Sequence, residues 1–129
     1  MSQLASLPVA AVTDFRDDYK LVDVGNVAAT LTASQLLRGI LYSNPATAVT
    51  LTLPTAALLV AMDQKAAVGS GLHVFLRNDN GVGVLTVAAG TGVTLAGKVT
   101  VGINSSAHFY VTYTNVTAAA EAVTVARLA

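Results

Sequence analysis

The chain has 129 residues, no cysteine and a formal net charge of zero, and only 11% of its residues are charged. A chain of this length is expected to form one domain whose core needs no metal or disulfide. The lack of cysteine excludes thiolate catalysis and cysteine zinc sites. The seven Lys and Arg residues are spread along the sequence, whereas nucleic-acid binding needs clustered cations. We therefore expect no nucleic-acid partner.

The apolar residues are mainly Ala and Val, and they make up 53% of the chain. No apolar run approaches the ~18 residues of a membrane helix, and the first residues lack the basic and apolar segments of a signal peptide. A small domain with so few charges exposes apolar surface, and large apolar patches usually mark contacts with other chains. We expect no membrane contact and a homo-oligomer.

Residues 1–19 show no sustained period and differ from the rest of the sequence. This segment is either a solvated terminus or an arm that orders against a neighbouring subunit or a partner. Aromatic and Arg side chains often dominate such contacts, which favours the second interpretation. The candidate interface residues of the arm are Phe15, Arg16, Asp17, Asp18 and Tyr19. Residues 20–129 would then form the folded domain.

The first half of the domain contains several short candidate strands and one clear helix. Strands are expected at 20–23, 26–32, 38–42 and 48–53, with a turn at Gly25-Asn26 and a helical turn at 33–37. The helix follows Pro54, with Thr55 as its N-cap. Its expected buried stripe is Leu58, Leu59, Met62 and Ala66.

From residue 71 onward, short runs alternate apolar and polar residues at period two. The clearest run places Phe109 and Val111 on one face and His108 and Tyr110 on the other. Residues 78–81 read as a hairpin turn, and 90–92, 96–98 and 104–106 as further turns. The pattern predicts an all-β fold with one short helix, an antiparallel β-sandwich of jelly-roll-like type.

The two histidines, His73 and His108, each lie in a predicted strand on the face opposite the apolar set. They could meet across adjacent strands and hold a metal with Asp79 or Glu121, but a surface or interface role is favoured. No Gly-x-Ser-x-Gly elbow or phosphate loop is present, and carboxylates are scarce. We expect no enzyme activity, cofactor, metal or small-molecule substrate.

About two-thirds of the chain, from residue 48 onward, resembles a β-rich module of virion proteins from tailed phages and some large DNA viruses. The segments that carry this resemblance are TLTLPTAALLVA (50–61), AAVGSGLHVFLRN (66–78), GVLTVAAGTGVTLAG (83–97) and YVTYTNVTAAAEAVTVARL (110–128). They include a Leu-Pro-Thr strand-to-helix junction and a closing Ala-Val-Thr-Val strand. None of these elements is catalytic.

The resemblance implies an exterior virion component, often trimeric, of the kind found in capsid decoration (cement) proteins and in tail-fibre tips. The sequence has no fibrous shaft beside the module, which favours a decoration protein on the outside of a phage capsid. Its partners would be itself, as a homotrimer, and the major capsid protein, and it would be made in the host cytoplasm. Two alternatives stay open. One is a receptor- or glycan-binding tip that uses Tyr110 or Tyr42, and the other is a host-encoded binding module or minor enzyme.

Overall fold

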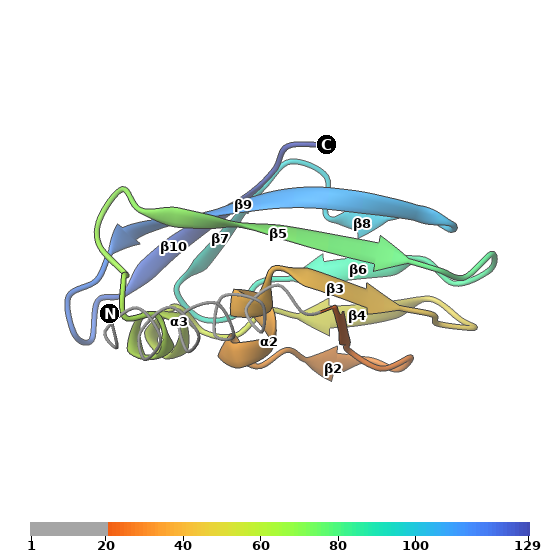
Figure 1. Cartoon of the computed structure of the whole chain (residues 1–129), viewed down its shortest axis with the longest axis horizontal. Coiled ribbons are helices and arrows are strands. Elements are labelled where there is room, and N and C mark those ends of the chain that lie inside the picture. Colours follow the sequence, from red (N-terminus) through yellow and green to blue (C-terminus); the bar gives the residue numbers. More distant parts are fainter. Residues whose placement is uncertain (1–20) are drawn as a thin grey trace, which may run out of the picture.

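The structure is a computed structural model that describes residues 21–129. Strands predominate, and they form a six-stranded and a four-stranded sheet (Figure 1). The six-stranded sheet contains, in spatial order, β1 (Val22–Asp23), β3 (Ile40–Ser43), β5 (Gly71–Asn78), β9 (Ser105–Asn115), β10 (Ala122–Arg127) and β7 (Val93–Ala96). The four-stranded sheet contains β2 (Ala29–Thr30), β4 (Val49–Thr52), β6 (Leu85–Ala88) and β8 (Thr100–Val101). The helices are α2 (Ala33–Arg38) and α3 (Ala56–Met62).

From β1 to β8, successive strands alternate between the two sheets. Strands that are neighbours in a sheet are therefore often parallel: β1, β3 and β5 run in one direction, as do β2, β4 and β6. Antiparallel pairs join β5 to β9, β9 to β10 and β6 to β8, while β10 and β7 are parallel. The predicted β-rich fold is confirmed, but the sheets are mixed and not purely antiparallel, because many turns carry the chain from one sheet to the other.

The loop after β5 illustrates why the predicted hairpin does not form. The Asn78 side chain is buried, and its Nδ2 atom donates to the carbonyl oxygens of Gly83, at 2.8 Å, and Val101, at 3.3 Å. Its Oδ1 atom accepts a bond of 3.0 Å from the Asn80 backbone. A buried amide with satisfied donors and acceptors holds this loop as it crosses to β6 in the other sheet.

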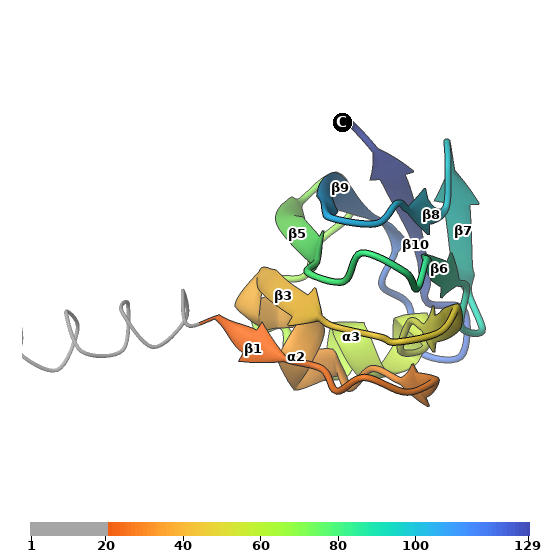
Figure 2. The ribbon, with the colours of Figure 1, turned by 90° about the vertical axis from the view of Figure 1, so that its right-hand side faces the viewer.

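Two consecutive strand–strand–helix units stack on each other, β1-β2-α2 and β3-β4-α3. Thr32 and Thr55 cap the two helices, and each side chain accepts a hydrogen bond from the third residue of its helix. Leu36 and Leu59 occupy equivalent buried positions. The two helices pack together (Figure 2). Residues 21–129 thus contain two helices where one was predicted, and the helical turn expected at 33–37 is α2.

The predicted buried stripe of the second helix is correct for Leu59 and wrong for two other residues. Leu59 is fully buried, whereas Leu58 is 56% exposed and Met62 is 54% exposed. Residues 58 and 62 share one side of a helix, and residue 59 is rotated by about 100° from residue 58 and by about 60° from residue 62. Because α3 has only seven residues, it contacts the core mainly through Ala56 and Leu59.

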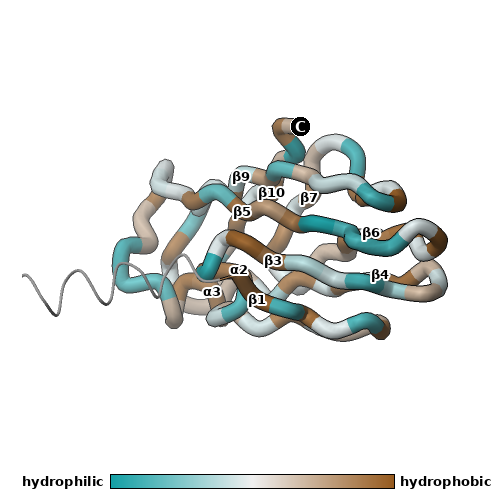
Figure 3. Tube along the Cα trace, turned by 45° about the vertical axis from the view of Figure 1, so that its right-hand side comes forward, coloured by the Kyte–Doolittle hydropathy of each residue, from teal (hydrophilic) through white to brown (hydrophobic). Residues whose placement is uncertain are grey.

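One core lies between the sheets and is made from the inward positions of both. In Figure 2, β1, β3 and β5 lie on one side of the molecule and the four-stranded sheet lies on the other, and Figure 3 shows hydrophilic residues gathering at the end of β5. The most deeply buried large apolar side chains of the core are Leu36, Leu41, Leu51, Leu59, Leu85, Val101, Val111, Tyr113 and Val123. None of the helices within residues 21–129 has the length and apolar character needed to cross a membrane.

Candidate functional site

The outer face of the six-stranded sheet carries four ring side chains on the adjacent strands β5 and β9. The inward residues of these strands fill the core, so period-two alternation directs His73, Phe75, His108 and Tyr110 outward. The antiparallel register pairs Phe75 with His108 and His73 with Tyr110. We call these four residues the aromatic cluster.

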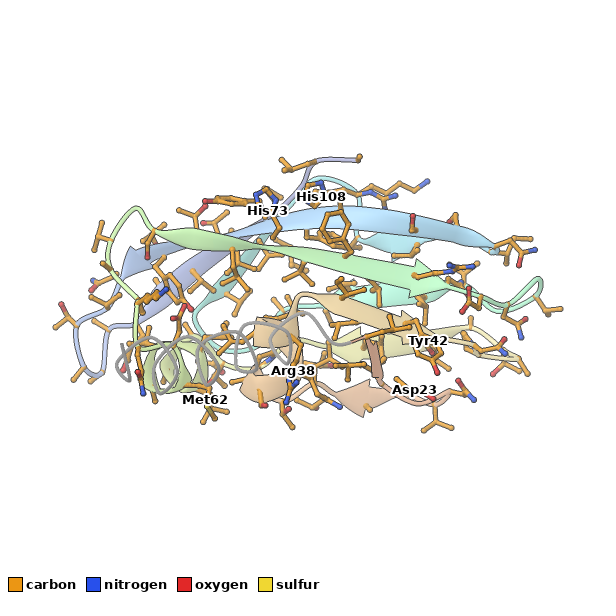
Figure 4. All side chains as sticks on the ribbon, viewed as in Figure 1. Asp23, Arg38, Tyr42, Met62, His73 and His108 are labelled. Atoms are coloured by element: carbon orange, nitrogen blue, oxygen red, sulfur yellow. The ribbon has the colours of Figure 1, made fainter. Side chains whose placement is uncertain are left out.

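The rings of the aromatic cluster are in direct contact. His73 Nδ1 lies 2.7 Å from His108 Nε2, a hydrogen bond that joins residues 35 positions apart. The Phe75 ring stacks on His108, with centroids 4.2 Å apart and planes at 12°, and Tyr110 meets His73 edge-on at 4.9 Å. Figure 4 shows the two histidines side by side outside the sheet. Phe75 remains 44% exposed, so the cluster presents an apolar ring beside two imidazoles.

A groove of about 800 Å³ runs beside the aromatic cluster and shares His73 and Phe75 with it. The other wall comes from the ends of α2 and α3 and from the loop after α3, and it includes Arg38, Met62 and Lys65 together with the carboxylate of Asp63. The groove therefore combines exposed apolar groups with two cations. Sequence reasoning missed it, because its walls come from segments that are distant in the chain.

A second outward group lies at the β1 edge of the same sheet. Tyr42 of β3 is paired in register with Asp23 of β1 and with Arg77 of β5. The negative charge of Asp23 raises the pKa of the Tyr42 phenol, and burial and a hydrogen bond to the same carboxylate act in the same direction. Tyr42 is therefore a phenol donor at neutral pH with charged groups on both sides.

The outer face of the four-stranded sheet is uncharged and made largely of threonine. The strand registers place Thr50, Thr86 and Thr100 in one row and Thr30 and Thr52 in the next. These hydroxyls and methyl groups give a surface that can hydrogen-bond or pack against a partner. It carries no charged side chain on its strands.

The structure brings together some of the residues singled out in the sequence and leaves others apart. His73 and His108 do meet across adjacent strands. Asp79 instead pairs with Arg77, and in the described part of the chain no three His, Cys, Asp or Glu side chains are grouped to hold a metal. The arm residues Phe15, Arg16, Asp17, Asp18 and Tyr19 lie outside the described residues.

Comparisons with protein-family models, curated proteins and solved structures found no match to this chain.

Proposed function

We propose that the chain is a structural virion protein, a capsid decoration or cement protein that binds the outside of a phage capsid as a trimer and stabilises the shell. The sequence resemblance suggests this class. The observation that carries the proposal furthest is the aromatic cluster, an outward face of rings in which Phe75 is 44% exposed. Exposed apolar surface of this kind favours contact with other protein chains.

The arrangement of the sheets supports the proposal. We infer that the two sheets, which enclose one apolar core, form a β-sandwich with mixed strand pairing. Such a domain is a rigid scaffold whose two outer faces stay available for contact. One outer face offers the aromatic cluster, and the other offers the threonine rows.

Low charge makes a capsid partner more plausible than a nucleic acid or a membrane surface. The strands of the four-stranded sheet contain no charged residue, and on the six-stranded sheet the charge of Arg77 is paired with that of Asp79. Docking would then rely on apolar packing and hydrogen bonds, which salt screens little. The partner proposed is the major capsid protein.

Trimer formation would turn weak contacts into tight binding. An arm contact of millimolar affinity contributes about 4 kcal/mol. Three linked contacts at an effective concentration near millimolar give far tighter attachment with no strong single site. We assign the arm contact to Phe15, Arg16, Asp17, Asp18 and Tyr19 and the homotrimer contacts to the folded domain.

The proposal is tested by mixing the purified protein with undecorated shells of the virus that encodes it. We expect the protein to sediment with the shells and to raise the temperature at which they rupture. A decoration role is excluded if the protein stays in the supernatant and leaves shell rupture unchanged. Bovine serum albumin at the same concentration controls for non-specific adsorption.

A second candidate function is a receptor- or glycan-binding tip of a tail or fibre. Tyr42, flanked by Asp23 and Arg77, and Tyr110 beside His73 both place an aromatic ring next to polar groups, as sugar sites require. Glycan-array binding by the free protein, lost in Tyr42→Ala or Tyr110→Ala, would support this candidate. Blocking of host adsorption by the free protein would support it further.

A further inference from the structure

The contact between His73 and His108 has a use beyond surface packing. We propose that the two imidazoles form an open chelating site for a borderline transition-metal dication, with Cu²⁺ and Ni²⁺ preferred over Zn²⁺. The sequence predicted a surface or interface role for these histidines and no metal, and this proposal departs from the second expectation. It does not depend on the proposed virion function.

The two ring nitrogens already lie within hydrogen-bond distance of each other. His73 Nδ1 and His108 Nε2 are 2.7 Å apart, so one donates a proton and the other accepts it. A metal ion can take the place of that shared proton when both rings are neutral and each carries its single hydrogen on the nitrogen that faces away from the other ring. These nitrogens are His73 Nε2 and His108 Nδ1. No change in net ring protonation is then required. The two rings must turn so that both lone pairs point at the ion instead of along the line between the nitrogens.

The spacing favours some coordination geometries over others. Two nitrogens about 2.05 Å from one ion lie roughly 2.9 Å apart at adjacent positions of a square-planar or octahedral site, but roughly 3.3 Å apart in a tetrahedral site. The observed 2.7 Å is a hydrogen-bond distance, so the nitrogens must separate by about 0.2 Å for the first geometry and by about 0.6 Å for the second. Tetragonal and octahedral geometries are those of Cu²⁺ and Ni²⁺, whereas Zn²⁺ in proteins is mostly tetrahedral. Imidazole nitrogen also disfavours Mg²⁺ and Ca²⁺, which prefer oxygen ligands.

The strands and the neighbouring rings hold the two ligands in place. Eight residue pairs join β5 to β9, so the backbone positions of the histidines are fixed by a continuous ladder. Phe75 stacks on His108, and Tyr110 contacts His73. Groups that orient metal ligands in this way typically change metal affinity 10- to 100-fold.

The remaining coordination positions are open to water or to an incoming group. His73 is exposed and His108 is half-buried. Residues 21–129 supply no third His, Cys, Asp or Glu to the pair. The site is therefore a two-nitrogen chelate of moderate affinity, in contrast to a closed structural site with four protein ligands.

The test uses the full chain, purified without a polyhistidine tag, because the natural sequence has only these two histidines. Titration calorimetry with CuCl₂, NiCl₂ and ZnCl₂ is expected to give one ion per chain, with Cu²⁺ tightest and Ni²⁺ tighter than Zn²⁺. His73→Ala and His108→Ala should each weaken binding more than about tenfold, and Phe75→Leu by about tenfold. Thr112→Ala, which lies on the same face of β9, is the matched control and should bind like the natural chain.

A spectroscopic readout separates ligation from any loss of folding in the variants. Electron paramagnetic resonance of the natural chain with one equivalent of Cu²⁺ should show coupling to two imidazole nitrogens. The proposal is overturned if that coupling is absent, or if the His73→Ala/His108→Ala double variant binds Cu²⁺ and Ni²⁺ as tightly as the natural chain. Tighter binding of Zn²⁺ than of Ni²⁺ would overturn the assignment of geometry.

Discussion

The hydroxyl of Tyr113 donates a hydrogen bond of 2.7 Å to the Oδ2 atom of Asp63. Tyr113 is 1% exposed and lies in β9, and Asp63 is the C-cap of α3. The bond ties the helix end to the longest strand across 50 residues of sequence. Burial raises the pKa of Tyr113, and the hydrogen bond to Asp63 and its charge raise it further.

Replacing Tyr113 by Phe should lower the free energy of unfolding at pH 7. The change removes a hydrogen bond to a charged acceptor, which is worth about 1.5–3 kcal/mol. Urea unfolding measures the difference. Tyr42→Phe, which alters a surface phenol, is the control and should lose less than about 1 kcal/mol. Equal losses in the two variants would refute a specific role for the Tyr113 bond.

The same bond predicts how stability depends on alkaline pH. The folded pKa of Tyr113 lies above the ordinary value of 10.0, so the folded state keeps a proton that the unfolded chain releases. The stabilisation is complete below about pH 10 and is lost as the pH rises above it, by up to about 1.4 kcal/mol per pH unit. Unfolding midpoints at pH 9, 10 and 11 should therefore fall more steeply for the natural chain than for Tyr113→Phe. Parallel curves would contradict this prediction.

Two glycines in the loop after β5 should respond very differently to alanine. A Cβ atom at Gly83 would lie 2.3 Å from the Pro45 carbonyl oxygen and 2.4 Å from that of Thr47, which are backbone atoms that cannot yield easily. At Gly81 the nearest atom is a side-chain nitrogen of Asn104, at 3.3 Å. We expect Gly83→Ala to cost about 3 kcal/mol and Gly81→Ala to cost less than about 1 kcal/mol. Thermal unfolding of the two variants checks this prediction. Equal midpoints would contradict the close approach of Gly83 to the carbonyl oxygens of Pro45 and Thr47.

The arm prediction concerns residues outside the described structure and is tested by binding. Phe15→Ala together with Tyr19→Ala should weaken attachment to shells at least tenfold, because aromatic anchors usually dominate such contacts. Ser2→Ala with Ser6→Ala, in the same segment, is the matched control. The domain itself should stay folded in both variants. Unchanged shell binding by the aromatic double variant would remove the arm from the account.

Salt should have little effect on attachment. The outer threonine rows and the aromatic cluster offer apolar and hydrogen-bonding contacts, which ionic screening weakens much less than exposed charge pairs. Protein bound to particles should therefore remain bound in 1 M NaCl, at an ionic strength where the Debye length is about 3 Å. Sedimentation of the particles followed by gel analysis measures the retained fraction. Release at a few hundred millimolar would indicate an electrostatic docking surface.

Local pattern predicted the later strands well. Period-two alternation placed Phe109 and Val111 opposite His108 and Tyr110, and these residues lie in β9 (Ser105–Asn115). The closing Ala-Val-Thr-Val segment lies in β10 (Ala122–Arg127). Strand pairing was not predictable in the same way. A turn such as 78–81 shows where the chain bends, whereas the buried contacts of Asn78 with Gly83 and Val101 decide which sheet it enters next.

A stronger sequence signal was present in the first half of the domain. The pattern Thr-Ala-x-x-Leu occurs at both 32–36 and 55–59 and marks the two capped helices of the stacked strand–strand–helix units. An internal repeat of this kind is typical of stacked parallel units. Contacts between distant segments, such as His73 with His108 and Tyr113 with Asp63, depend on strand register and helix packing. Alternation indicated that the two histidines face outward and could meet across adjacent strands, but it did not give the strand register that brings them into contact.

The most direct test of the decoration proposal is an image reconstruction of intact particles of the virus that encodes this chain. We predict density for three copies of the domain around a local threefold axis, on the outer surface of the shell and in contact with the major capsid protein. Density confined to a tail or fibre tip, or no density for the protein in the particle, would contradict the account.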